Sequence, residues 1–551
     1  MTTLIPKYDQ GSTGAVNRAI NLKLAETISI LDFGADPTGT SDSTTAIQNA
    51  INSGAGSLYF PTGTYLVTSL NVVSNQNWHG DGQYATTLTW SQTNISTPTQ
   101  NMLNSTGDLA NWSIQDIGLL GNLAVQTSPD STGQNLTGIK FRAGSLQNIR
   151  FERIYVRQFG DQTKASGAGA LIGPTSGTGK ILSNIRFLSC TFESIARVPG
   201  IYINANNATT TSANGVLIQN CIFNNNTNYA TQNCIFVLTL GTGAAAILFT
   251  NVIIQNNIFN ISNTIDTCIE LNECNGFTIS GNEINVTSTA SCTGVLIRSN
   301  TRVGEISNNS INNNGTGCSS STAIALVPFG SDSESNIDII GNSIVNFGQY
   351  GIQLTATAQI NVTGNTIVNN QGTPTGIQIA NTSNLEVSSN YFYGCFQAFL
   401  LGAGTNGLLN IVISNNTMVS CGSSGNPLIS SVTTNENMTY LVIRNNVIQS
   451  IVSGSTYFIS VSTAASTGNR LENNVLPSTL TLLNPSYASS FIGQITPAIG
   501  IGQLSLITSG TTANRPTSSA IIGQSYYDTS LGIPIWYSGS SIWKNASGST
   551  V

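Results

Sequence analysis

Asp and Glu are the residues of this 551-residue sequence that are best suited to catalysis, and the sequence contains few of them. The chain has 24 Asp and Glu residues, 18 Lys and Arg residues and one His. The single His79 removes most metal-ligand sets, and we interpret it as a turn residue; no metal or cofactor is predicted. Two carboxyl groups roughly 5 Å apart, or about 6.5–9.5 Å apart, can hydrolyse a glycosidic bond. Acids at matched positions of a repeat are therefore the first catalytic candidates.

Four of these acids fall in one repeated part of the sequence. Glu305 and Asp338 each precede the first aliphatic residue of a recurring phrase, and Asp332 and Glu334 lie in the segment that leads into the second phrase. We expect Glu305 and Asp338 on one outward face of neighbouring coils, about 4.8 Å apart at the backbone. We also expect all four acids to share a surface patch, where like charges keep a proton on one carboxyl. The alternative is a solvated acidic patch or a cation site.

A second acidic cluster lies in TIDTCIELNEC, residues 264–274. Glu270 is its catalytic candidate, with Asp266 and Glu273 as substrate-binding candidates. Asp266 and Glu270 would be about 13 Å apart on an extended strand, so Glu270 would need another carboxylate across a groove or from a neighbouring subunit. We expect Arg298 diagonally beside Glu270 on the next coil, where it binds substrate or forms a weak surface ion pair.

Basic and aromatic residues supply the remaining candidates. Nine of the 18 Lys and Arg residues lie between residues 140 and 197. This basic band could hold an anionic polysaccharide, supply the base of a lyase, or pair with nearby acids. The repeat region has no Trp, so sugar stacking would fall to tyrosines, with Tyr202 and Tyr350 as candidates. The basic residues are Lys140, Arg142, Arg150, Arg153, Arg157, Lys164, Lys180, Arg186 and Arg197.

The element that must position these residues is a short repeat. An aliphatic residue, two small or polar residues, Asn, one further residue and a second aliphatic recur with a mean interval of 28.4, which is 284 residues divided by ten intervals. We expect the Asn residues to form an architectural ladder, with Asn in a left-handed turn. The repeated position is occupied by Cys190, Cys221, Asn257, Asn282, Asn309, Asn342, Asn365, Asn390, Asn416, Asn446 and Asn474.

The repeat predicts the fold class. A second alternating strand precedes each phrase, and no helical crossovers separate the strands. This pattern is typical of an all-β, right-handed, single-stranded parallel β-helix, of about 11–14 coils here. The nine Cys residues show no metal-ligand spacing, and we expect them to be reduced and buried. Residues 42–54 predict a helix that caps the open end of the β-core, with Asp42 or Ser43 as its N-cap.

The two ends of the chain carry a family resemblance. The motifs DFGAD (32–36), DSTTAIQNAI (42–51) and YFPTGTY (59–65) resemble the opening of the pectate-lyase-like superfamily as it occurs in bacteriophage tailspikes. Residues 7–30 resemble the neck that precedes this domain in tail proteins. Residues 515–548 are similar to a C-terminal segment of phage tail fibres and spikes.

The resemblance implies a homotrimeric tailspike of the virion, made in the host cytoplasm, that binds and usually cleaves a bacterial surface polysaccharide. We expect residues 1–30 to attach to phage tail or baseplate proteins, residues 31–480 to form the receptor-binding and catalytic β-helix, and residues 481–551 to form a trimerisation or tip domain. The leading hypothesis for its activity is endo-glycosidic hydrolysis by paired carboxylates. The alternatives are a polysaccharide lyase of the same fold and a tail protein that binds glycan without cutting it.

Composition argues against other classes of protein. The formal net charge of −6 gives no footprint for nucleic acid, and no apolar run is long enough to predict a membrane span. The opening residues lack an apolar signal core, which together with the two phage-like ends disfavours a secreted pectinase-like enzyme.

Overall fold

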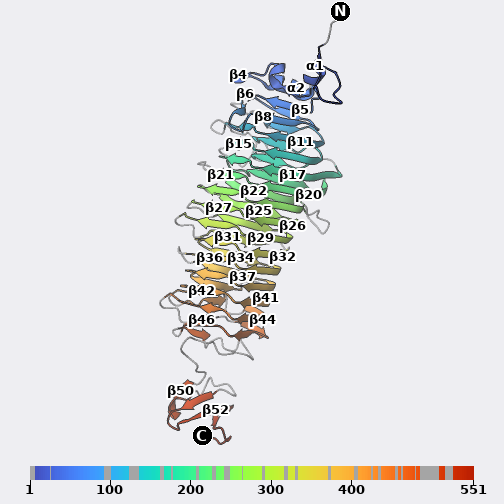
Figure 1. Cartoon of the computed structure of the whole chain (residues 1–551). Coiled ribbons are helices and arrows are strands. Elements are labelled where there is room, and N and C mark those ends of the chain that lie inside the picture. The colour runs from blue at the N-terminus through green and yellow to red at the C-terminus, as the bar shows by residue number, and fades with distance from the viewer. Residues whose placement is uncertain are drawn as a thin grey trace, which may run out of the picture.

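The chain folds into a long stack of parallel strands, seen in Figure 1 as a continuous column between the N-terminal helices and a small C-terminal sheet. The computed structural model describes residues 6–24, 26–91, 101–122, 136–161, 167–174, 178–206, 210–225, 231–240, 249–262, 265–287, 292–315, 320–328, 333–369, 374–402, 407–423, 426–431, 436–452, 457–460, 463–477, 480–483, 508–515 and 525–551.

Three parallel sheets make up this column, and each successive coil adds one strand to each sheet. Sheet I contains β3 (Ile28–Ser29), β5 (Ser57–Phe60), β8 (Asn77–Gly80), β11 (Leu109–Gln115), β14 (Leu146–Glu152), β17 (Lys180–Leu188), β20 (Thr210–Gln219), β23 (Phe249–Gln255), β26 (Cys274–Ser280), β29 (Arg302–Ser307), β32 (Ser335–Ile340), β35 (Ala358–Thr363), β38 (Ser383–Ser388), β41 (Leu408–Ser414), β44 (Glu436–Arg444), β47 (Thr463–Thr467) and β48 (Arg470–Glu472).

Sheet II contains β4 (Thr38–Asp42), β6 (Gly63–Val67), β9 (Thr86–Trp90), β12 (Gly118–Leu120), β15 (Tyr155–Arg157), β18 (Thr191–Glu193), β21 (Ile222–Asn225), β24 (Ile258–Ile261), β27 (Glu283–Val286), β30 (Ser310–Asn313), β33 (Ser343–Val345), β36 (Thr366–Val368), β39 (Tyr391–Tyr393), β42 (Thr417–Val419) and β45 (Val447–Ile448). Sheet III contains β7 (Leu70–Val72), β10 (Leu103–Ser105), β13 (Ile139–Phe141), β16 (Ala170–Ile172), β19 (Ile201–Asn206), β22 (Thr231–Leu240), β25 (Ile265–Asn272), β28 (Thr293–Arg298), β31 (Thr322–Leu326), β34 (Tyr350–Thr355), β37 (Thr375–Ala380), β40 (Gln397–Leu401), β43 (Ile429–Ser431), β46 (Tyr457–Ser460) and β49 (Thr481–Leu483).

This architecture is a parallel β-helix, as the repeat predicts. Sheets II and III contain fifteen strands each, and leaving out β4 and β49 of the incomplete end coils gives fourteen complete coils, in agreement with the expected 11–14. The first of these coils lack the Asn phrase. Inward side chains stack between coils, as Phe192, Phe223 and Phe259 do with ring centroids 5.3 and 4.9 Å apart.

The asparagine ladder is confirmed in detail. From Asn257 to Asn446, each backbone N–H and each side-chain Nδ2 donates to the Oδ1 of the next Asn along the ladder, at 2.9–3.0 Å. The expected left-handed turn lies one residue earlier than predicted, for example at Asn256 and Gly341. This placement lets the preceding residue turn the chain while the ladder Asn points inward and satisfies buried backbone groups.

The capping helix is α2 (Thr44–Asn52), which buries Ile47, Ala50 and Ile51. Asp42 accepts a hydrogen bond from the backbone N–H of Thr44 at 2.8 Å, one of the donors left free at a helix N-terminus. The helix contacts β7 and therefore covers the first coils. No helix within the described residues is long and apolar enough to cross a membrane.

Small elements stand at both ends of the column. The N-terminal one pairs β1 (Lys7–Tyr8) with β2 (Arg18–Ala19), followed by α1 (Ile20–Leu24) and the short 3₁₀ helix η1 (Ile30–Phe33). The C-terminal one combines the 3₁₀ helix η3 with a four-stranded sheet around Tyr526, Ile535 and Trp543. Its elements are β50 (Thr508–Gly510), η3 (Thr512–Asn514), β51 (Ser525–Asp528), β52 (Ile533–Gly539) and β53 (Ile542–Lys544).

The eight described cysteines are buried free thiols, as expected. Burial raises the pKa of Cys234 and Cys274, so these thiols stay protonated and unreactive. Cys318 lies outside the described residues.

Candidate functional site

The predicted pair Glu305 and Asp338 lies in register on β29 and β32 of sheet I. Their backbones are therefore about one strand spacing, roughly 4.8 Å, apart. Both side chains are exposed. Within the described part of the chain, neither carboxylate forms a hydrogen bond or ion pair. The predicted register of the pair is thus confirmed, but none of the described residues orients the two carboxylates.

Two other members of the proposed acidic patch do not join this pair. Glu334 is 0% exposed, so the prediction that it lies on the surface with Glu305 is wrong. The register pairs Arg302 with Ser335, which puts Glu334 on the buried corner row that contains Thr301. Asp332 lies outside the described residues.

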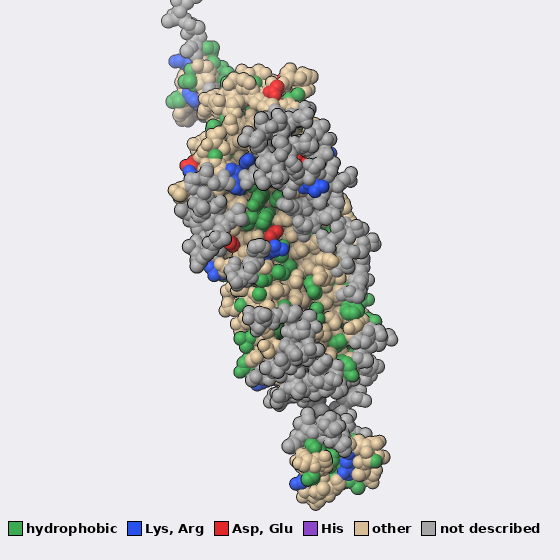
Figure 2. All heavy atoms as spheres, turned by 180° about the vertical axis from the view of Figure 1, so that it is seen from behind, with side chains coloured by type: hydrophobic (Ala, Val, Ile, Leu, Met, Phe, Trp, Pro, Cys, Tyr) green, Lys and Arg blue, Asp and Glu red, His purple; other side chains and the backbone are tan. Residues whose placement is uncertain are grey.

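Sheet III presents a different surface, which we call the Glu270 face. One outward row of it consists, in register, of Lys140, Leu171, Tyr202, Phe236, Glu270 and Leu296. The neighbouring row includes Asn204, Leu238, Asn272 and Arg298. Most of these side chains are buried or half-buried even though they point away from the β-helix core. Figure 2 shows that hydrophobic, basic and acidic side chains occur close together on one side of the molecule.

Glu270 is held by three neighbours. It is 8% exposed, and its Oε2 accepts a hydrogen bond from Asn233 Nδ2 at 2.8 Å. Its Oε1 accepts from Asn272 Nδ2 at 3.3 Å and lies 4.0 Å from Arg298 Nε. The diagonal placement of Arg298 is therefore confirmed. Asn233 was missed because its strand carries no acidic or repeated signal, and only the register brings it beside Glu270.

Tyr202 forms the aromatic part of the Glu270 face. Its ring stacks on Phe236, with centroids 5.2 Å apart and planes 7° apart. Its Oη accepts a hydrogen bond from Asn204 Nδ2 at 3.0 Å. Burial raises the pKa of Tyr202, while Asn204 and the positive charge of Arg142 oppose this rise. The phenol interacts electrostatically with Arg142 and with Glu270, so these three groups form one cluster.

Lys140 and Arg142 lie at the N-terminal end of this cluster, on β13 and directly after it. Arg142 is only 7% exposed, and burial lowers its pKa to about 10. Burial and the charge of Arg142 lower the pKa of Lys140. Because Lys140 and Arg142 are two positions apart on an extended segment, their side chains lie on the same outward face.

Much of the predicted basic band is paired with acids elsewhere. Arg153 forms ion pairs with Asp116 and Glu152. Arg157 Nε lies 3.2 Å from Glu193 Oε1. Similar pairs join Arg150 to Glu152 and Lys180 to Asp108. The ion-pair alternative is thus correct for this part of the band, whereas Lys140 and Arg142 belong to the Glu270 face. Lys164 lies outside the described residues.

The remaining candidates are Glu273, Tyr350 and Asp266, of which Tyr350 lies away from the cluster. Glu273 lies in a left-handed turn after β25, with φ 56°. Tyr350 begins β34, in register with Thr322 and Thr375, three strands along sheet III from Glu270. The side chain of Asp266 lies outside the part that the structure describes.

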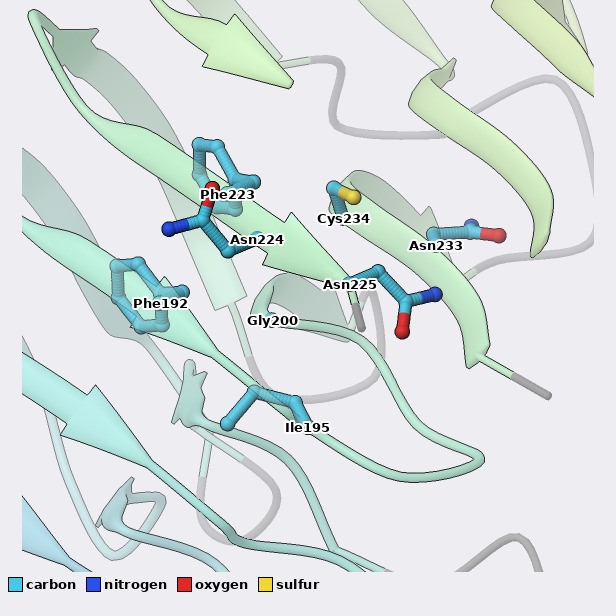
Figure 3. Close-up of a pocket in the computed structure, with 8 residues that line it drawn as sticks. All are labelled: Phe192, Ile195, Gly200, Phe223, Asn224, Asn225, Asn233 and Cys234. Atoms are coloured by element: carbon cyan, nitrogen blue, oxygen red, sulfur yellow. The ribbon is translucent and has the colours of Figure 1, made fainter. Parts of the chain in front are cut away.

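A small hollow lies at the corner between β21 and β22. Asn233 is part of its lining and also donates to Glu270. Figure 3 shows Phe192 and Phe223 on neighbouring strands, and Asn233 and Cys234 on another strand. The full lining is Phe192, Ile195, Gly200, Phe223, Asn224, Asn225, Asn233 and Cys234.

Comparison with known protein families identifies the fold. The family described as "Right handed beta helix region" matches residues 326–435. Together with the three stacked parallel sheets, this match defines the chain as a right-handed parallel β-helix protein. No curated protein matches the chain.

Several solved β-structures of phages are similar to this chain. Tailspike protein 3 of bacteriophage CBA120 has 17% identity, with 99% of this chain and 73% of that chain covered and a TM-score of 0.46. The N-terminal fragment of bacteriophage Phi29 gene product 12 has 14% identity, 82% coverage of both chains and a TM-score of 0.48. The tailspike of E. coli bacteriophage HK620, solved in complex with a pentasaccharide, has 13% identity, 88% and 81% coverage and a TM-score of 0.40.

Proposed function

We propose that this chain is a bacteriophage tailspike that binds a bacterial surface polysaccharide along the Glu270 face and depolymerises it. The observation that carries this proposal is the electrostatic cluster of Arg142, Tyr202 and Glu270, which lie on every second strand of sheet III with Phe236 between the last two. A sugar site needs a flat aromatic surface, buried polar groups that fix orientation and an ionisable group at the bond to be cut. The cluster supplies all three. Assembly as a homotrimer, attachment through residues 1–30 and a place in the virion belong to the same proposal and rest on the resemblance of the two ends.

For hydrolysis, Glu270 is the better-positioned carboxylate, and its surroundings suit a nucleophile or general base. The hydrogen bonds that it accepts from Asn233 and Asn272 fix the carboxylate, whereas Glu305 and Asp338 are exposed. A glycosidase commonly needs a second carboxylate. Among the described side chains in the strands of sheet III, Glu270 is the only carboxylate, so the partner would come from Asp266, another segment or a neighbouring subunit. The spacing of Glu305 and Asp338 also suits a retaining pair, which makes it the competing hydrolytic site.

One observation favours elimination as a second candidate reaction. The positive charge of the buried Arg142 and the hydrogen bond that Tyr202 Oη accepts from Asn204 both favour the phenolate, against the burial that raises the pKa of Tyr202. In a lyase reaction, a base removes the proton next to the carboxylate of a uronic acid, and the glycosidic C–O bond breaks with the electron pair leaving on oxygen. Tyr202 would act as this base and Arg142 would stabilise the carboxylate.

The test is to incubate the purified protein with surface polysaccharides from candidate hosts and to follow product masses and ultraviolet absorbance. Products that gain one water per cleavage, without new absorbance, establish hydrolysis. Products without added water, and with the absorbance of an unsaturated uronate, establish elimination. A polysaccharide that binds but stays intact would contradict depolymerisation and leave a receptor-binding tail protein.

Tyr202→Phe distinguishes the two reactions further. The variant keeps the ring that stacks on Phe236 but lacks the hydroxyl. If elimination occurs, we expect cleavage to fall by about 10²- to 10⁴-fold with little change in binding. If Glu270 hydrolyses the glycan, the loss should be about tenfold or less, because only one hydrogen-bonding group is removed.

A further inference from the structure

We propose that the polysaccharide is anionic, and that one of its carboxylate or phosphate groups binds to Lys140 and Arg142. This inference rests on the proposed function, because it names the chemical class of the glycan that the Glu270 face takes.

First, the two cations, Lys140 and Arg142, occupy neighbouring outward positions at the end of β13. Lys140 is the central residue of β13, and Arg142 follows this strand on the same outward face. Arg142 is almost fully buried and Lys140 is half-buried. Removing a cation from water is costly unless an anion or several acceptors replace the lost hydration. The half-buried Lys140, which forms no ion pair within the described residues, therefore suits a bound anion, with Arg142 on the same outward face.

The second argument is the electrostatics of the same spot. The charge of Arg142 lowers the pKa of Lys140, so the two cations repel each other. Within the described residues, Lys140 has no ion pair with a carboxylate. Lys140 differs in this from Arg153 and Arg157 on the adjoining sheets, which are paired with acids. An anionic substituent between Lys140 and Arg142 would relieve the repulsion.

The third argument is the surface that continues from these cations. Sheet III places Tyr202 and Phe236 two and three strands beyond β13, Glu270 after them and Arg298 after Glu270. Five strand spacings separate Lys140 from the strand of Arg298, roughly 24 Å. A glycan several sugar rings long would place its anionic group on Lys140 and Arg142, stack its rings on the two aromatics and present a linkage to Glu270.

The experiment uses the polysaccharide that the protein cleaves in the assay above, in its native, carboxyl-reduced and dephosphorylated forms. Binding is measured by affinity electrophoresis at low and high salt with the full chain, Lys140→Met, Lys140→Arg and the matched control Arg444→Met. Arg444 is exposed and is the last residue of β44 in sheet I. The Arg444→Met substitution therefore removes one positive charge, as Lys140→Met does, but far from β13 along the chain.

We expect removal of the relevant anion to weaken binding by about ten- to a hundredfold, the effect of losing a charge-assisted hydrogen bond. Carboxyl reduction and dephosphorylation show which anion is responsible. Lys140→Met should cause a similar loss and reduce the salt dependence, Lys140→Arg should restore binding, and Arg444→Met should resemble the unmodified protein.

Equal binding of the native and uncharged glycans, or unchanged binding by Lys140→Met, would overturn the inference. So would a cleaved polysaccharide that proves to be neutral, although the proposed function would then stand. If no surface polysaccharide is bound or cleaved, the proposed function itself fails.

Discussion

Sheets I and III are built from the same coils, yet they treat their outward side chains differently. On sheet I, Glu305 and Asp338 are exposed, and the described residues give them no hydrogen bond. On sheet III, Glu270 is 8% exposed and accepts hydrogen bonds from two asparagines. The carboxylate pair has the more suggestive spacing, whereas the single carboxylate has the more suitable environment.

This difference shows why spacing alone is a weak guide to chemistry on a repeating fold. A parallel β-helix brings any two outward residues at matched positions of successive coils within one strand spacing of each other. Proximity is therefore common along its surface. Partial dehydration and fixed hydrogen-bond partners are rarer, and they make a carboxyl group useful as an acid or base.

The largest expected effect comes from Glu270. Glu270→Gln keeps the shape and can keep the hydrogen bond from Asn233, but it removes the ionisable carboxyl. We expect cleavage of the polysaccharide to fall by about 10²- to 10⁴-fold. The matched double variant Glu305→Gln with Asp338→Asn should remain within about twofold of the unmodified protein, because these groups are exposed and unoriented.

Initial cleavage rates, with circular dichroism to verify folding, check this comparison. If the double variant loses activity and Glu270→Gln does not, the active site lies on sheet I and the comparison must be reversed.

The next largest effect is a loss of stability when an inward Asn of the ladder is replaced, compared with an Asn on the outward row of sheet I. Asn342→Ala removes a buried amide that accepts from Asn309 and donates to Asn365 Oδ1 and Ile306 O. We expect the free energy of unfolding to fall by about 2–4 kcal/mol, since buried partners are left unsatisfied. Asn361→Ala on the outward row of sheet I removes one half-buried acceptor, of Thr363 Oγ1 at 2.7 Å, and should lower the free energy of unfolding by no more than about 1 kcal/mol. Denaturant unfolding of both variants tests this, and equal losses would mean that the ladder contributes no special stability.

The smallest effect is expected at Arg298. Its Nε lies 4.0 Å from Glu270 Oε1, and its side chain is 37% exposed. Such an ion pair contributes at most about 1 kcal/mol, so Arg298→Gln should slow cleavage less than about fivefold. Measured kcat and KM separate two roles. A large increase in KM alone would show that Arg298 contacts the glycan rather than only steadying Glu270.

Much of the fold was predictable because the same physical requirement recurs in every coil. Nine of the eleven repeated positions are occupied by Asn, so the repeated phrase was easy to recognise. The register of Glu305 with Asp338 followed directly from aligning these phrases. The number of coils could be predicted only as a range because the early coils form their turns without this phrase. Glu334 was misplaced because the residue before a strand stands at a corner, where a shift of one position turns a side chain from outside to inside.

The candidate site was only partly predictable. Glu270, Arg298 and Tyr202 were chosen from their chemistry and from strand alternation. Which residues lie beside them, such as Asn233, Asn204 and Arg142, depends on the lengths of the insertions between the strands. Because the interval between repeats varies, the sequence does not show which residues of different coils come into register.

The sequence by itself determined the parallel β-helix, its capping helix and its ladder, because local periodicity dictates which side chains face inward. The tertiary structure alone decided which outward side chains are dehydrated and which stay in water. Burial of an outward group depends on what lies beside and over it, and residues far apart in the chain supply that environment. For this reason the Glu270 face, rather than the better-spaced carboxylate pair, became the proposed site.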